Sequence, residues 1–311
     1  MNEEKNERRK TMEIKTVPLQ NGAYLTAYLP DAQTGYQVYK TRPGILLAPG
    51  GSYLYLATRE SEGIALEFLG RGFNVYLIHY SVGFTTREAR ENNTGHLDTD
   101  HHFPQPALEM LEAIHLLKTN AKEMNLDPDA LFLMGFSAGG HLCGTIGTMW
   151  NDPDLISQLD FVPEGNELKA AGMVLAYPMI HPMSDTHYFV NDPQEISSWL
   201  MKDFLFQTRK PSDEQMESVN LITKVSDETV PAFVWQCEDD PIVNPLNSTE
   251  FVLALQKHGI PCEYQLFDHG GHGLGLAKEL YAKVPEEIDD RIAQWPDAAE
   301  AWMKRIIKTQ K

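Results

Sequence analysis

Residues 131–140 read Leu-Phe-Leu-Met-Gly-Phe-Ser-Ala-Gly-Gly, an apolar run that ends in a G-x-S-x-G motif, and a helical pattern follows at 138–149. A sharp turn from strand to helix would hold Ser137 in a strained conformation, and the glycines on either side relieve the crowding that a Cβ would create. The serine hydroxyl would then be exposed above a sheet, beside a helix N-terminus that favours negative charge. The stretch therefore predicts a nucleophilic serine. The alternative is a glycine-rich turn whose serine only caps the helix.

The rest of the chain places this motif within a recurring pattern of short apolar runs and longer helical segments. Strands are predicted at 45–48, 73–79, 131–134, 173–177, 232–236 and 264–267. Helices are predicted at 61–69, 105–124, 138–149, 248–258 and 297–307. Asn247, three residues before Glu250, predicts a capping box near the start of the fourth helix. This order is typical of an α/β fold, with a mostly parallel sheet covered by helices on both faces.

We expect a single α/β domain over residues 1–311, since neither an internal repeat nor a low-complexity tract divides the chain. Residues 178–229 differ from the rest, because they are rich in Met, Pro, Asp and Ser and contain one amphipathic piece around 196–206. This segment is predicted to be a small insertion, a cap over the carboxyl edge of the sheet, rather than a second domain. Residues 1–12 carry many charges and are expected to be flexible.

The composition describes an ordinary globular protein, with 42% hydrophobic and 23% charged residues among 311. The 26 basic and 44 acidic residues give a formal net charge of −18, which repels nucleic-acid phosphates and anionic lipid surfaces. The N-terminus places charges where a signal peptide needs an apolar run, and the chain lacks an apolar stretch long enough for a membrane span. We therefore expect a cytoplasmic protein without nucleic-acid or membrane partners, and a homo-oligomer stays open.

The three cysteines, Cys143, Cys237 and Cys262, lie in or beside apolar segments. Buried free cysteines usually behave as small hydrophobic residues, and a disulfide framework is typical of short secreted chains. We therefore predict free buried thiols, with neither disulfides nor a catalytic cysteine.

A serine hydroxyl is a weak nucleophile until a neighbouring base removes its proton, so the chain should supply a histidine that an acid holds in place. The predicted strand at 264–267 opens into Asp-His-Gly-Gly-His-Gly at 268–273. His272 is flanked by glycines that let the backbone bend toward the serine, which makes it the predicted general base. His269 is the alternative.

The acid is predicted to follow the preceding strand, where 232–236 opens into Cys-Glu-Asp-Asp-Pro-Ile-Val at 237–243. Asp240 is favoured because Pro241 stiffens the turn on which an orienting carboxylate has to be held. Asp239 is its main rival.

Acyl transfer also needs hydrogen-bond donors for the oxyanion that develops, usually backbone N–H groups after the nucleophile and in a glycine-rich loop after an early strand. The predicted strand at 45–48 runs into Pro-Gly-Gly-Ser-Tyr at 49–53. The amides of Gly51, Ser52 and Ala138 are therefore the predicted oxyanion hole. A plain turn at the end of a strand is the alternative.

Other polar and aromatic residues near these segments have plainer interpretations. A polar loop holds five residues of metal-binding type: His96, Asp98, Asp100, His101 and His102. Because five such residues within seven positions rarely converge on one ion, we predict no metal site. His141, one turn after Ser137, is expected to be a packed or capping histidine rather than a second base. The residues at strand ends that could line a substrate pocket, or simply belong to the core, are Tyr53, Tyr80, Tyr177 and Met179.

Taken together, these motifs resemble the α/β-hydrolase superfamily of esterases and lipases, most closely the acetyl esterases and acetyl-xylan-esterase-like carbohydrate esterases. The matching stretches run from Ile45 to the C-terminus and comprise 49–53, 73–82, 135–142, 239–243, 270–273, and 294–296 with Trp302. Serine, acid and histidine also follow one another in the order that this fold uses. The resemblance implies that Ser137, Asp240 and His272 form a catalytic triad.

The oxyanion segment departs from the pattern of these esterases. They often have His-Gly-Gly-Gly there, whereas this chain has Pro49 in place of the histidine and Ser52 in place of the third glycine. The backbone donors survive both exchanges, but the loop, and with it the acyl pocket, is expected to differ in shape.

We therefore expect a serine carboxylesterase that hydrolyses short-chain (acetyl) esters of sugars or small oligosaccharides, with a small-molecule ester as its partner and no metal or other cofactor. The acidic residues scattered through 178–229 leave no continuous apolar face for docking on lipid. A serine peptidase or amidase of the same fold is the alternative, although such peptidases carry a large domain ahead of the hydrolase domain and only about 40 residues precede the first core strand here. A catalytically inactive binding module conflicts with the presence of all three triad members.

Overall fold

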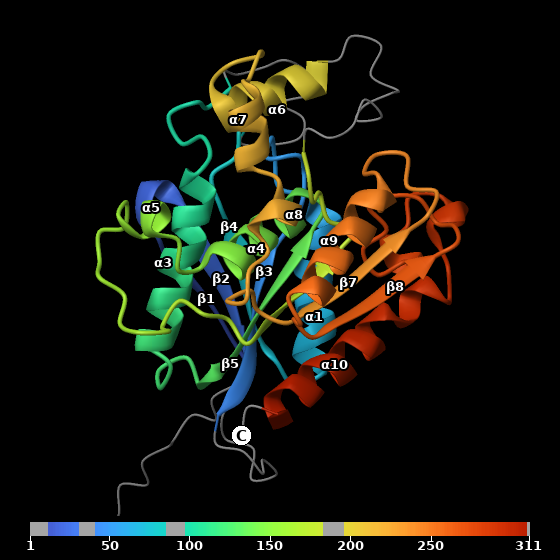
Figure 1. Ribbon diagram of the computed structural model, residues 1–311. Helices are drawn as coiled ribbons and strands as arrows, with labels where there is room; N and C mark the ends of the chain where they lie inside the picture. Colours follow the sequence, from blue (N-terminus) through green and yellow to red (C-terminus); the bar gives the residue numbers. More distant parts are fainter. Residues whose placement is uncertain (1–11, 31–40, 85–96, 183–195, 310–311) are drawn as a thin grey trace, which may run out of the picture.

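Eight strands form one sheet in the computed structural model, which describes residues 12–30, 41–84, 97–182 and 196–309 (Figure 1). Their order across the sheet is β1-β2-β4-β3-β5-β6-β7-β8. The strands are β1 (Glu13–Pro18), β2 (Tyr24–Leu29), β3 (Arg42–Ala48), β4 (Asn74–His79), β5 (Leu126–Phe136), β6 (Gly172–Ala176), β7 (Ala232–Cys237) and β8 (Cys262–Phe267). The strands from β3 to β8 pair in parallel, which confirms the expected α/β fold with a mostly parallel sheet.

The sequence patterns predict the six parallel strands and miss the two antiparallel ones. β1 pairs with β2, and β2 with β4, both in antiparallel. β1 lies at the edge of the sheet, and its side chains alternate between exposed and half-buried. An edge strand of this kind needs no run of apolar residues, so it leaves a weak signal in the sequence.

Helices cover both faces of the sheet (Figure 1). One face carries α1 (Glu62–Gly70) and α10 (Trp295–Thr309). The other face carries α3 (Gln105–Thr119), α4 (Ala138–Met149) and α9 (Pro245–Lys257). All five helices were expected from the sequence, although α3 ends before its predicted boundary at 124.

The two cores follow from the alternation of side chains along each strand. In β3, Leu46 and Ala48 point toward the α3 and α4 side, while Ile45 and Leu47 point toward α1 and α10. All four are completely buried. Each large side chain buried in this way contributes about 1.5–3 kcal/mol through removal of apolar surface from water. With both faces covered, the carboxyl edge of the sheet is the place where loops can build a site.

The start of α9 differs from the predicted one. Asn244 caps the helix, since its Oδ1 accepts a hydrogen bond from the N–H of Leu246 at 2.9 Å. Pro245 occupies the first helical position, where its fixed φ suits the helix. The predicted capping box of Asn247 and Glu250 is therefore wrong, because both residues lie inside the helix.

The described part of the segment 178–229 forms three helices: α6 (Ile196–Phe206), α7 (Asp213–Ser218) and α8 (Leu221–Lys224). Figure 1 shows α6 and α7 beyond the carboxyl ends of the central strands, and α6 coincides with the predicted amphipathic piece. The Phe204 ring stacks on the Tyr53 ring with centroids 6.1 Å apart. Residues 183–195 lie outside the described residues, as does most of 1–12. A cap function for this segment, and the flexibility of the N-terminus, stay predictions.

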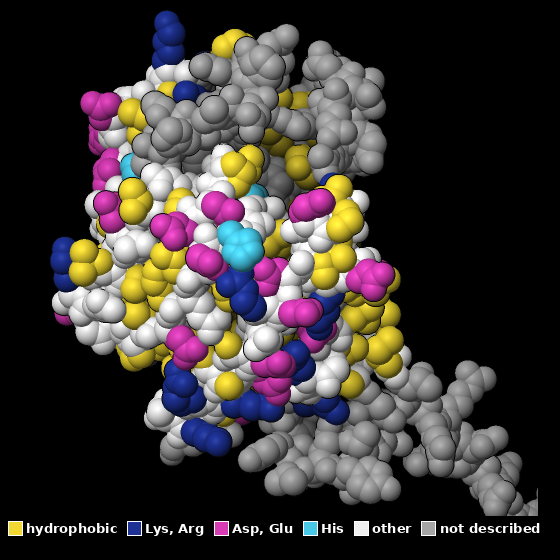
Figure 2. Space-filling view, turned by 90° about the vertical axis from the view of Figure 1, so that its right-hand side faces the viewer, with side chains coloured by type: hydrophobic (Ala, Val, Ile, Leu, Met, Phe, Trp, Pro, Cys, Tyr) yellow, Lys and Arg dark blue, Asp and Glu magenta, His cyan; other side chains and the backbone are white. Residues whose placement is uncertain are grey.

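The face beside β8 and α10 mixes acidic and basic side chains across its described part (Figure 2). Arg291 contacts Asp268 at 2.8 Å and Asp289 at 3.2 Å, and Arg305 contacts Glu263 at 2.9 Å. Arg291 and Arg305 are thus paired with carboxylates. Across the ranges that the structure describes, none of the helices is both long and apolar enough to span a membrane.

Candidate active site

Ser137 lies in the sharp turn between β5 and α4, at the carboxyl edge of the sheet. Its backbone has φ 50° and ψ −116°, a conformation that residues with a Cβ rarely adopt. The flanking glycines are required by close contacts. A Cβ on Gly135 would approach Gly139 O to 2.1 Å, and a Cβ on Gly139 would approach Ala48 O to 2.1 Å. The motif therefore forms the strained strand-to-helix turn that its sequence predicts.

The main chain of Ser137 is fixed by hydrogen bonds on both sides. Its N–H donates to Ala176 O at 3.1 Å, at the end of β6. Its carbonyl accepts from the N–H groups of Met179 and His141, each at 3.0 Å. The neighbouring strand and the first turn of α4 together support the strained turn.

Ser137, His272 and Asp240 form an unbroken hydrogen-bonded row. Ser137 Oγ lies 3.0 Å from His272 Nε2, and His272 Nδ1 lies 2.7 Å from Asp240 Oδ2. Because a carboxylate only accepts, Nδ1 carries the proton and Nε2 is left to accept from the serine hydroxyl. Ser137 is 8% exposed, and the His272 side chain is 14% exposed. The structure thus brings together the serine, the base and the acid that the sequence predicts.

Asp240 is held by four hydrogen bonds in the turn after β7. Its Oδ1 accepts from the N–H groups of Ile242 and Val243 at 2.8 and 2.9 Å. Its Oδ2 accepts from His272 and, at 3.3 Å, from Gln236 Nε2. The side chain is completely buried. These donors satisfy the oxygens of an ionised carboxylate and fix its direction.

The two rival residues take other places. Asp239 Oδ1 accepts a hydrogen bond from the N–H of Gly271 at 2.9 Å, so it holds the histidine loop without contacting the imidazole. His269 has a side chain that is 62% exposed, and it contacts Asp268 and Arg291 at the surface. Neither rival completes the row that begins at Ser137.

The surroundings of His272 favour its protonated form. Burial lowers the pKa of this imidazole, but the charge of Asp240 and the hydrogen bond to it, together with the charge of Glu60, more than offset burial. The pKa of His272 is therefore raised above its usual 6.5. Such a histidine can take up a proton from a serine and hold it until a leaving group needs it.

The predicted oxyanion loop lies directly beside the serine. β3 and β5 are neighbours with Ala48 opposite Gly135, and a Cβ on Gly50 would lie 2.8 Å from Ser137 Cβ. Gly51 has φ 121°, and a Cβ there would approach Tyr55 O to 1.9 Å. Only glycine fits this position, because both its φ and the close approach of backbone exclude a side chain.

The amides of Gly51, Ser52 and Ala138 have no hydrogen-bond partner within the described part of the chain. Ser52 has φ 58°, so the loop turns back on itself after Gly51, whose carbonyl accepts from Leu54 N–H at 2.9 Å. Ala138 is the first residue of α4, where helix N–H groups lack partners within the helix. Unpaired N–H groups next to a nucleophile are what an oxyanion hole requires.

Tyr53 and Tyr80 support the oxyanion loop from inside the protein. Tyr53 OH donates to His141 Nδ1 at 2.8 Å, and Tyr80 OH donates to Pro49 O at 2.5 Å. His141 Nε2 in turn donates to Val219 O at 2.9 Å, and burial lowers the pKa of His141 to about 4. Both ring nitrogens of His141 are occupied, so the expected packed histidine is what the structure contains.

Tyr177 and Met179 contact His272 and Ser137, respectively. The Tyr177 ring packs edge-on against His272 with centroids 4.9 Å apart, and Met179 follows two residues later. Both are almost completely buried, as are Tyr53 and Tyr80. The three tyrosine hydroxyls make hydrogen bonds inside the protein, as core residues do, and a role of these four residues as walls of the acyl pocket stays a prediction.

In the loop that holds the possible metal-binding residues, the described side chains contact neighbours in the same loop. Asp98 Oδ2 pairs with His101 Nδ1 at 2.9 Å, while Asp98 Oδ1 accepts from the N–H of Asp100 at 2.9 Å. His102 Nδ1 donates to the adjacent Phe103 carbonyl. His96 lies outside the described residues. Among the residues that the structure describes, no group of three or more histidine, cysteine or carboxylate side chains could hold a metal ion.

The cysteines are free, as predicted, with Cys143 and Cys237 buried and Cys262 half-buried. Burial raises the pKa of the Cys143 thiol, and burial together with nearby carboxylates raises that of Cys237 to about 12. Both side chains are therefore protonated at neutral pH, and they act as small hydrophobic residues.

Two polar residues next to the row escape prediction from the sequence. Glu60 is 4% exposed and hydrogen-bonds Gly50 N–H, but it occurs in a polar run at 58–62 that reads as a surface turn. Gln236 is completely buried and hydrogen-bonds both Asp240 and Ser248. Gln236 could have been found from the sequence, because a glutamine within an otherwise apolar strand indicates a buried polar contact.

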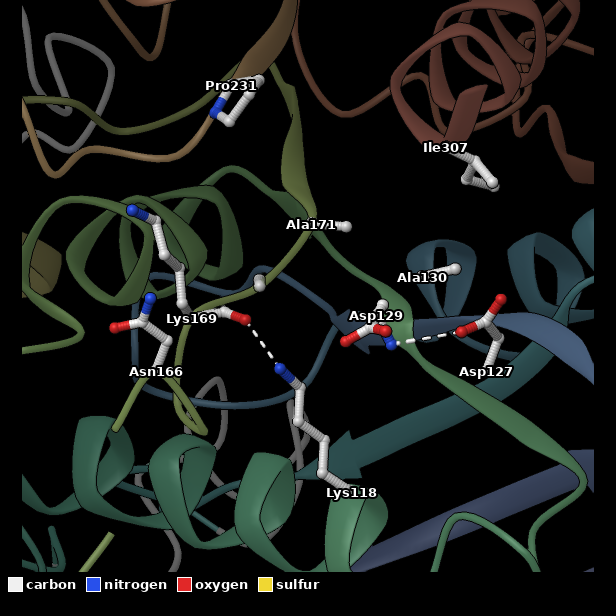
Figure 3. A pocket seen from close by; sticks show the side chains of 10 residues that line it. Lys118, Asp127, Asp129, Ala130, Asn166, Lys169, Ala171, Pro231 and Ile307 are labelled. Atoms are coloured by element: carbon white, nitrogen blue, oxygen red, sulfur yellow. Dashed lines mark hydrogen bonds between the residues drawn. The ribbon is translucent and has the colours of Figure 1, made fainter. Parts of the chain in front are cut away.

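A cavity of about 330 Å³ opens at the opposite edge of the sheet, near the amino ends of β5, β6 and β7 (Figure 3). Its wall contains Lys118, whose Nζ donates to the backbone carbonyl of Lys169 at 2.7 Å, together with Asp127 and Asp129. Ser137 follows the carboxyl end of β5. This cavity is therefore separate from the candidate active site.

Comparison with known proteins identifies the family of this chain. The family model described as BD-FAE matches residues 91–255, more than half of the chain. The chain belongs to the BD-FAE family. The matched range of the BD-FAE family includes the turn of Ser137 and reaches past Asp240 into α9.

Curated relatives of this BD-FAE family member are longer than the chain. An endo-1,4-beta-xylanase B of Butyrivibrio fibrisolvens is 30% identical over 242 residues, which cover 77% of this chain and 34% of that protein. An acetylxylan esterase of Xylanibacter ruminicola is 22% identical over 282 residues, which cover 88% of this chain and 48% of that protein. The chain thus spans between about a third and a half of the length of these relatives.

Solved structures match this BD-FAE family member over nearly all of its length. A carboxylesterase from Lactobacillus plantarum shares 25% identity and a TM-score of 0.76, covering 95% of this chain and 98% of that one. An acetyl ester-xyloside bifunctional hydrolase from Caldicellulosiruptor lactoaceticus shares 27% identity and a TM-score of 0.71, covering 94% and 96%. These likenesses confirm the resemblance to α/β-hydrolase esterases, the fold, and the expected class of carboxylic-ester hydrolases.

Proposed function

We propose that the protein is a serine esterase that removes short acyl groups, acetyl above all, from sugars or small oligosaccharides. The single observation that carries the chemistry is the row from Ser137 Oγ through His272 to Asp240, with distances of 3.0 and 2.7 Å. Nucleophile, base and orienting acid are within hydrogen-bond reach of one another before any substrate binds. The proposal needs neither a metal nor another cofactor.

In the first half of the reaction, Ser137 Oγ attacks the ester carbonyl carbon while His272 Nε2 takes the hydroxyl proton. The carbonyl π bond opens, and its electron pair becomes the oxyanion. Donors for that oxyanion are the amides of Gly51, Ser52 and Ala138, which are unpaired among the described residues. When the carbonyl re-forms, the ester C–O bond breaks and the alcohol leaves with the proton from His272.

In the second half, water takes the place of the alcohol. His272 removes a proton from the water, whose oxygen attacks the acyl carbon bound to Ser137. The same amides bind the second oxyanion. The bond between the acyl carbon and Ser137 Oγ then breaks, and His272 returns its proton to Oγ. Asp240 keeps the imidazole in the tautomer that both halves need and stabilises the imidazolium that forms in each.

Two observations support a short acyl group on a sugar. Relatives include an acetylxylan esterase and an acetyl ester-xyloside hydrolase, as their names state. Bulky Tyr53 lies in the oxyanion segment and stacks against Phe204 of α6, so space beside the loop is taken by aromatic rings. Each methylene that fits an apolar pocket adds up to about 1 kcal/mol of binding, so a long pocket would show rates that climb with chain length.

The decisive experiment combines an activity assay with labelling of the nucleophile. The wild-type protein should hydrolyse p-nitrophenyl acetate and leave an aminoacyl anilide intact, and a fluorophosphonate should modify Ser137, as located by peptide mapping. Ser137→Ala should abolish both hydrolysis and labelling. Label on another serine, or none on the folded protein, would contradict the proposal, whereas faster cleavage of the anilide would point to a peptidase or amidase.

The substrate is tested with two further series. Across p-nitrophenyl esters from two to eight carbons, kcat/KM should be highest for the shortest acyl groups. Acetylated xylo-oligosaccharides should release acetate at kcat/KM at least comparable to that of p-nitrophenyl acetate. A steady rise toward octanoate would replace the acetyl esterase by a broader carboxylesterase, and inactivity on the sugars would remove the carbohydrate half of the proposal.

A further inference from the structure

A second buried carboxylate, Glu60, lies at the active site without a part in the reaction described above. It ends the short helix η2 (Thr58–Glu60) and is 4% exposed. Its Oε2 accepts a hydrogen bond from Gly50 N–H at 2.7 Å, and its Oε1 accepts from Tyr177 OH at 2.9 Å. Tyr177 OH also accepts from Gly275 N–H at 3.0 Å. A buried acid with this set of partners calls for an explanation beyond packing.

The hydrogen bonds indicate that Glu60 is ionised. Gly50 N–H can only donate, and Tyr177 OH has a single proton. Gly275 N–H already donates to the tyrosine oxygen. Each of the three hydrogen atoms therefore has an acceptor only when Tyr177 OH donates to Glu60. The pKa of Glu60 is raised above its usual 4.5, because burial outweighs the bond from Gly50, the charge of His272 and the bond from Tyr177, which all lower it. The geometry thus selects the carboxylate.

Glu60 connects the two loops on which the reaction depends. Toward the oxyanion side, its Oε2 and Ser137 Cβ each lie 2.8 Å from the position that a Cβ on Gly50 would take. Toward the base side, Tyr177 packs against the His272 ring, and its hydroxyl holds the loop that follows the histidine through Gly275.

The neighbouring residue strengthens the link to the histidine loop. Arg59 Nη1 donates to Gly273 O at 2.9 Å, one residue after His272. Arg59 Nη2 pairs with Glu287 at 2.7 Å, with side chains that are 15% and 23% exposed. The two last residues of η2 therefore contact both loops, and the positive charge of the Arg59 guanidinium favours the ionised form of Glu60.

We propose that Glu60 is a positioning residue of the esterase reaction, which sets the oxyanion loop through Gly50 and the histidine loop through Tyr177. The proposal rests on the proposed function, since it assigns a role within that reaction. One side chain would then keep the distance between the oxyanion donors and the base constant while the acyl group changes from planar to tetrahedral. Catalysis gains most from groups that are already arranged for the transition state.

The charge of Glu60 has two opposing effects on catalysis. It favours the imidazolium of His272, but the same charge repels the oxyanion that forms at the same moment. The imidazolium and the oxyanion form together, so the favourable and unfavourable effects of the Glu60 charge on them partly cancel. The value of kcat should therefore report mainly on positioning. In the free enzyme there is no oxyanion, and the pKa of His272 then responds to the charges around it, which are Asp240 and Glu60, with Tyr177 neutral. The two observables separate geometry from charge.

The test compares Glu60→Gln and Tyr177→Phe with wild type on p-nitrophenyl acetate across pH. An amide at position 60 has to turn its NH₂ either toward Gly50 N–H, which cannot accept, or toward the Tyr177 oxygen, which already accepts from Gly275 N–H, so one link is weakened together with the loss of the charge. We expect kcat to fall by about ten- to a hundredfold with KM changed by less than about threefold, and the acid limb of kcat/KM to move to lower pH. Tyr177→Phe should lower kcat without that movement, because the Glu60 charge remains.

Glu109→Gln is the matched control, since Glu109 is also buried and also accepts hydrogen bonds from a backbone N–H and a hydroxyl, those of Ser81, with a further one from the Gln105 side chain. Its kcat should stay within about twofold of wild type. A Glu60→Gln variant that is folded, with wild-type kcat and an unmoved acid limb, would overturn the proposal. If that variant does not fold, wild-type kcat in Tyr177→Phe overturns it instead. An inactive wild type that escapes fluorophosphonate would reject the proposed function, and this role with it, so the two failures are distinguishable.

Discussion

Gly271 N–H donates a 2.9 Å hydrogen bond to Asp239 Oδ1, one residue before the carboxylate that holds His272. Two adjacent aspartates thus serve the same loop in different ways. Asp239 holds the backbone of the loop from the side of the solvent, whereas Asp240 is buried and holds the imidazole itself. Their substitutions should therefore have unequal consequences.

Asp240→Asn should lower kcat by about 10³- to 10⁴-fold, because an amide at this position no longer fixes the tautomer of His272 or stabilises its protonated form. Asp239→Asn keeps an oxygen for Gly271 N–H and should cost less than about tenfold. Steady-state kinetics on p-nitrophenyl acetate measure both, with circular dichroism to show that each variant is folded. The reverse ranking would move the acid by one residue.

The pH dependence of kcat/KM should report on His272. Only the neutral imidazole can accept the serine proton, and the surroundings raise the pKa of His272 above 6.5. Activity should therefore rise with pH through an apparent pKa above 6.5 and then level off. In Asp240→Asn the residual activity should show an acid limb at lower pH, because the charge that raises the pKa is gone. A wild-type limb clearly below 6.5 would contradict this account of the site.

Gly51→Ala should abolish most of the activity, because a Cβ there would approach Tyr55 O to 1.9 Å on a backbone with φ 121°. The loop has to shift, and its amides shift with it, so we expect kcat to fall at least about a hundredfold. Gly70→Ala is the control, since a Cβ at that position, the last of α1, meets no atom within 4 Å. It should leave kcat unchanged and the melting temperature equal or slightly higher. Equal kinetics for the two variants would show that the loop does not contribute to catalysis.

Glu109 should make the stability of the protein depend on pH. Burial raises the pKa of this carboxyl to about 7, although hydrogen bonds from Ser81 oppose the rise. The folded state then binds more protons than the unfolded state between about 4.5 and 7, so this contribution is full at low pH and is lost as pH rises through that window.

Glu109→Gln imitates the protonated acid, because its amide can accept from Ser81 N–H and donate to Ser81 Oγ. The variant should exceed wild type in stability at pH 8.5 by on the order of 1–3 kcal/mol, and the difference should shrink toward pH 4.5. Thermal unfolding at both pH values measures this. A difference that is the same at both would show that Glu109 is ionised in the fold throughout.

The sequence specifies the parallel part of the sheet better than its antiparallel edge. Buried strands such as β3 and β5 need apolar residues on both sides, and these runs stand out in the chain. β1 and β2 lie at one end of the sheet, where Ile14 is 53% exposed and polar residues alternate with apolar ones. β2 joins the rest of the sheet through β4, far along the chain, and no local pattern records that contact.

The same contrast holds within the active site. Ser137 and His272 occur in turns that need glycines for their backbone conformation, and these glycines are visible in the local sequence. Glu60 has no such local pattern, because its partners Gly50 and Tyr177 come from the loops that follow β3 and β6. Residues of the first kind can be predicted from neighbours in sequence, whereas residues of the second kind need the three-dimensional structure.

The three hydrogen bonds on the main chain of Ser137 tie the nucleophile to the interior of the domain rather than to a surface loop. The amide protons of His141 and Met179 should accordingly exchange with solvent only through opening of the sheet itself, at rates set by global unfolding. Heating should then inactivate the protein and unfold it at the same temperature. Ser137 should therefore keep its position for as long as β5, β6 and α4 remain packed.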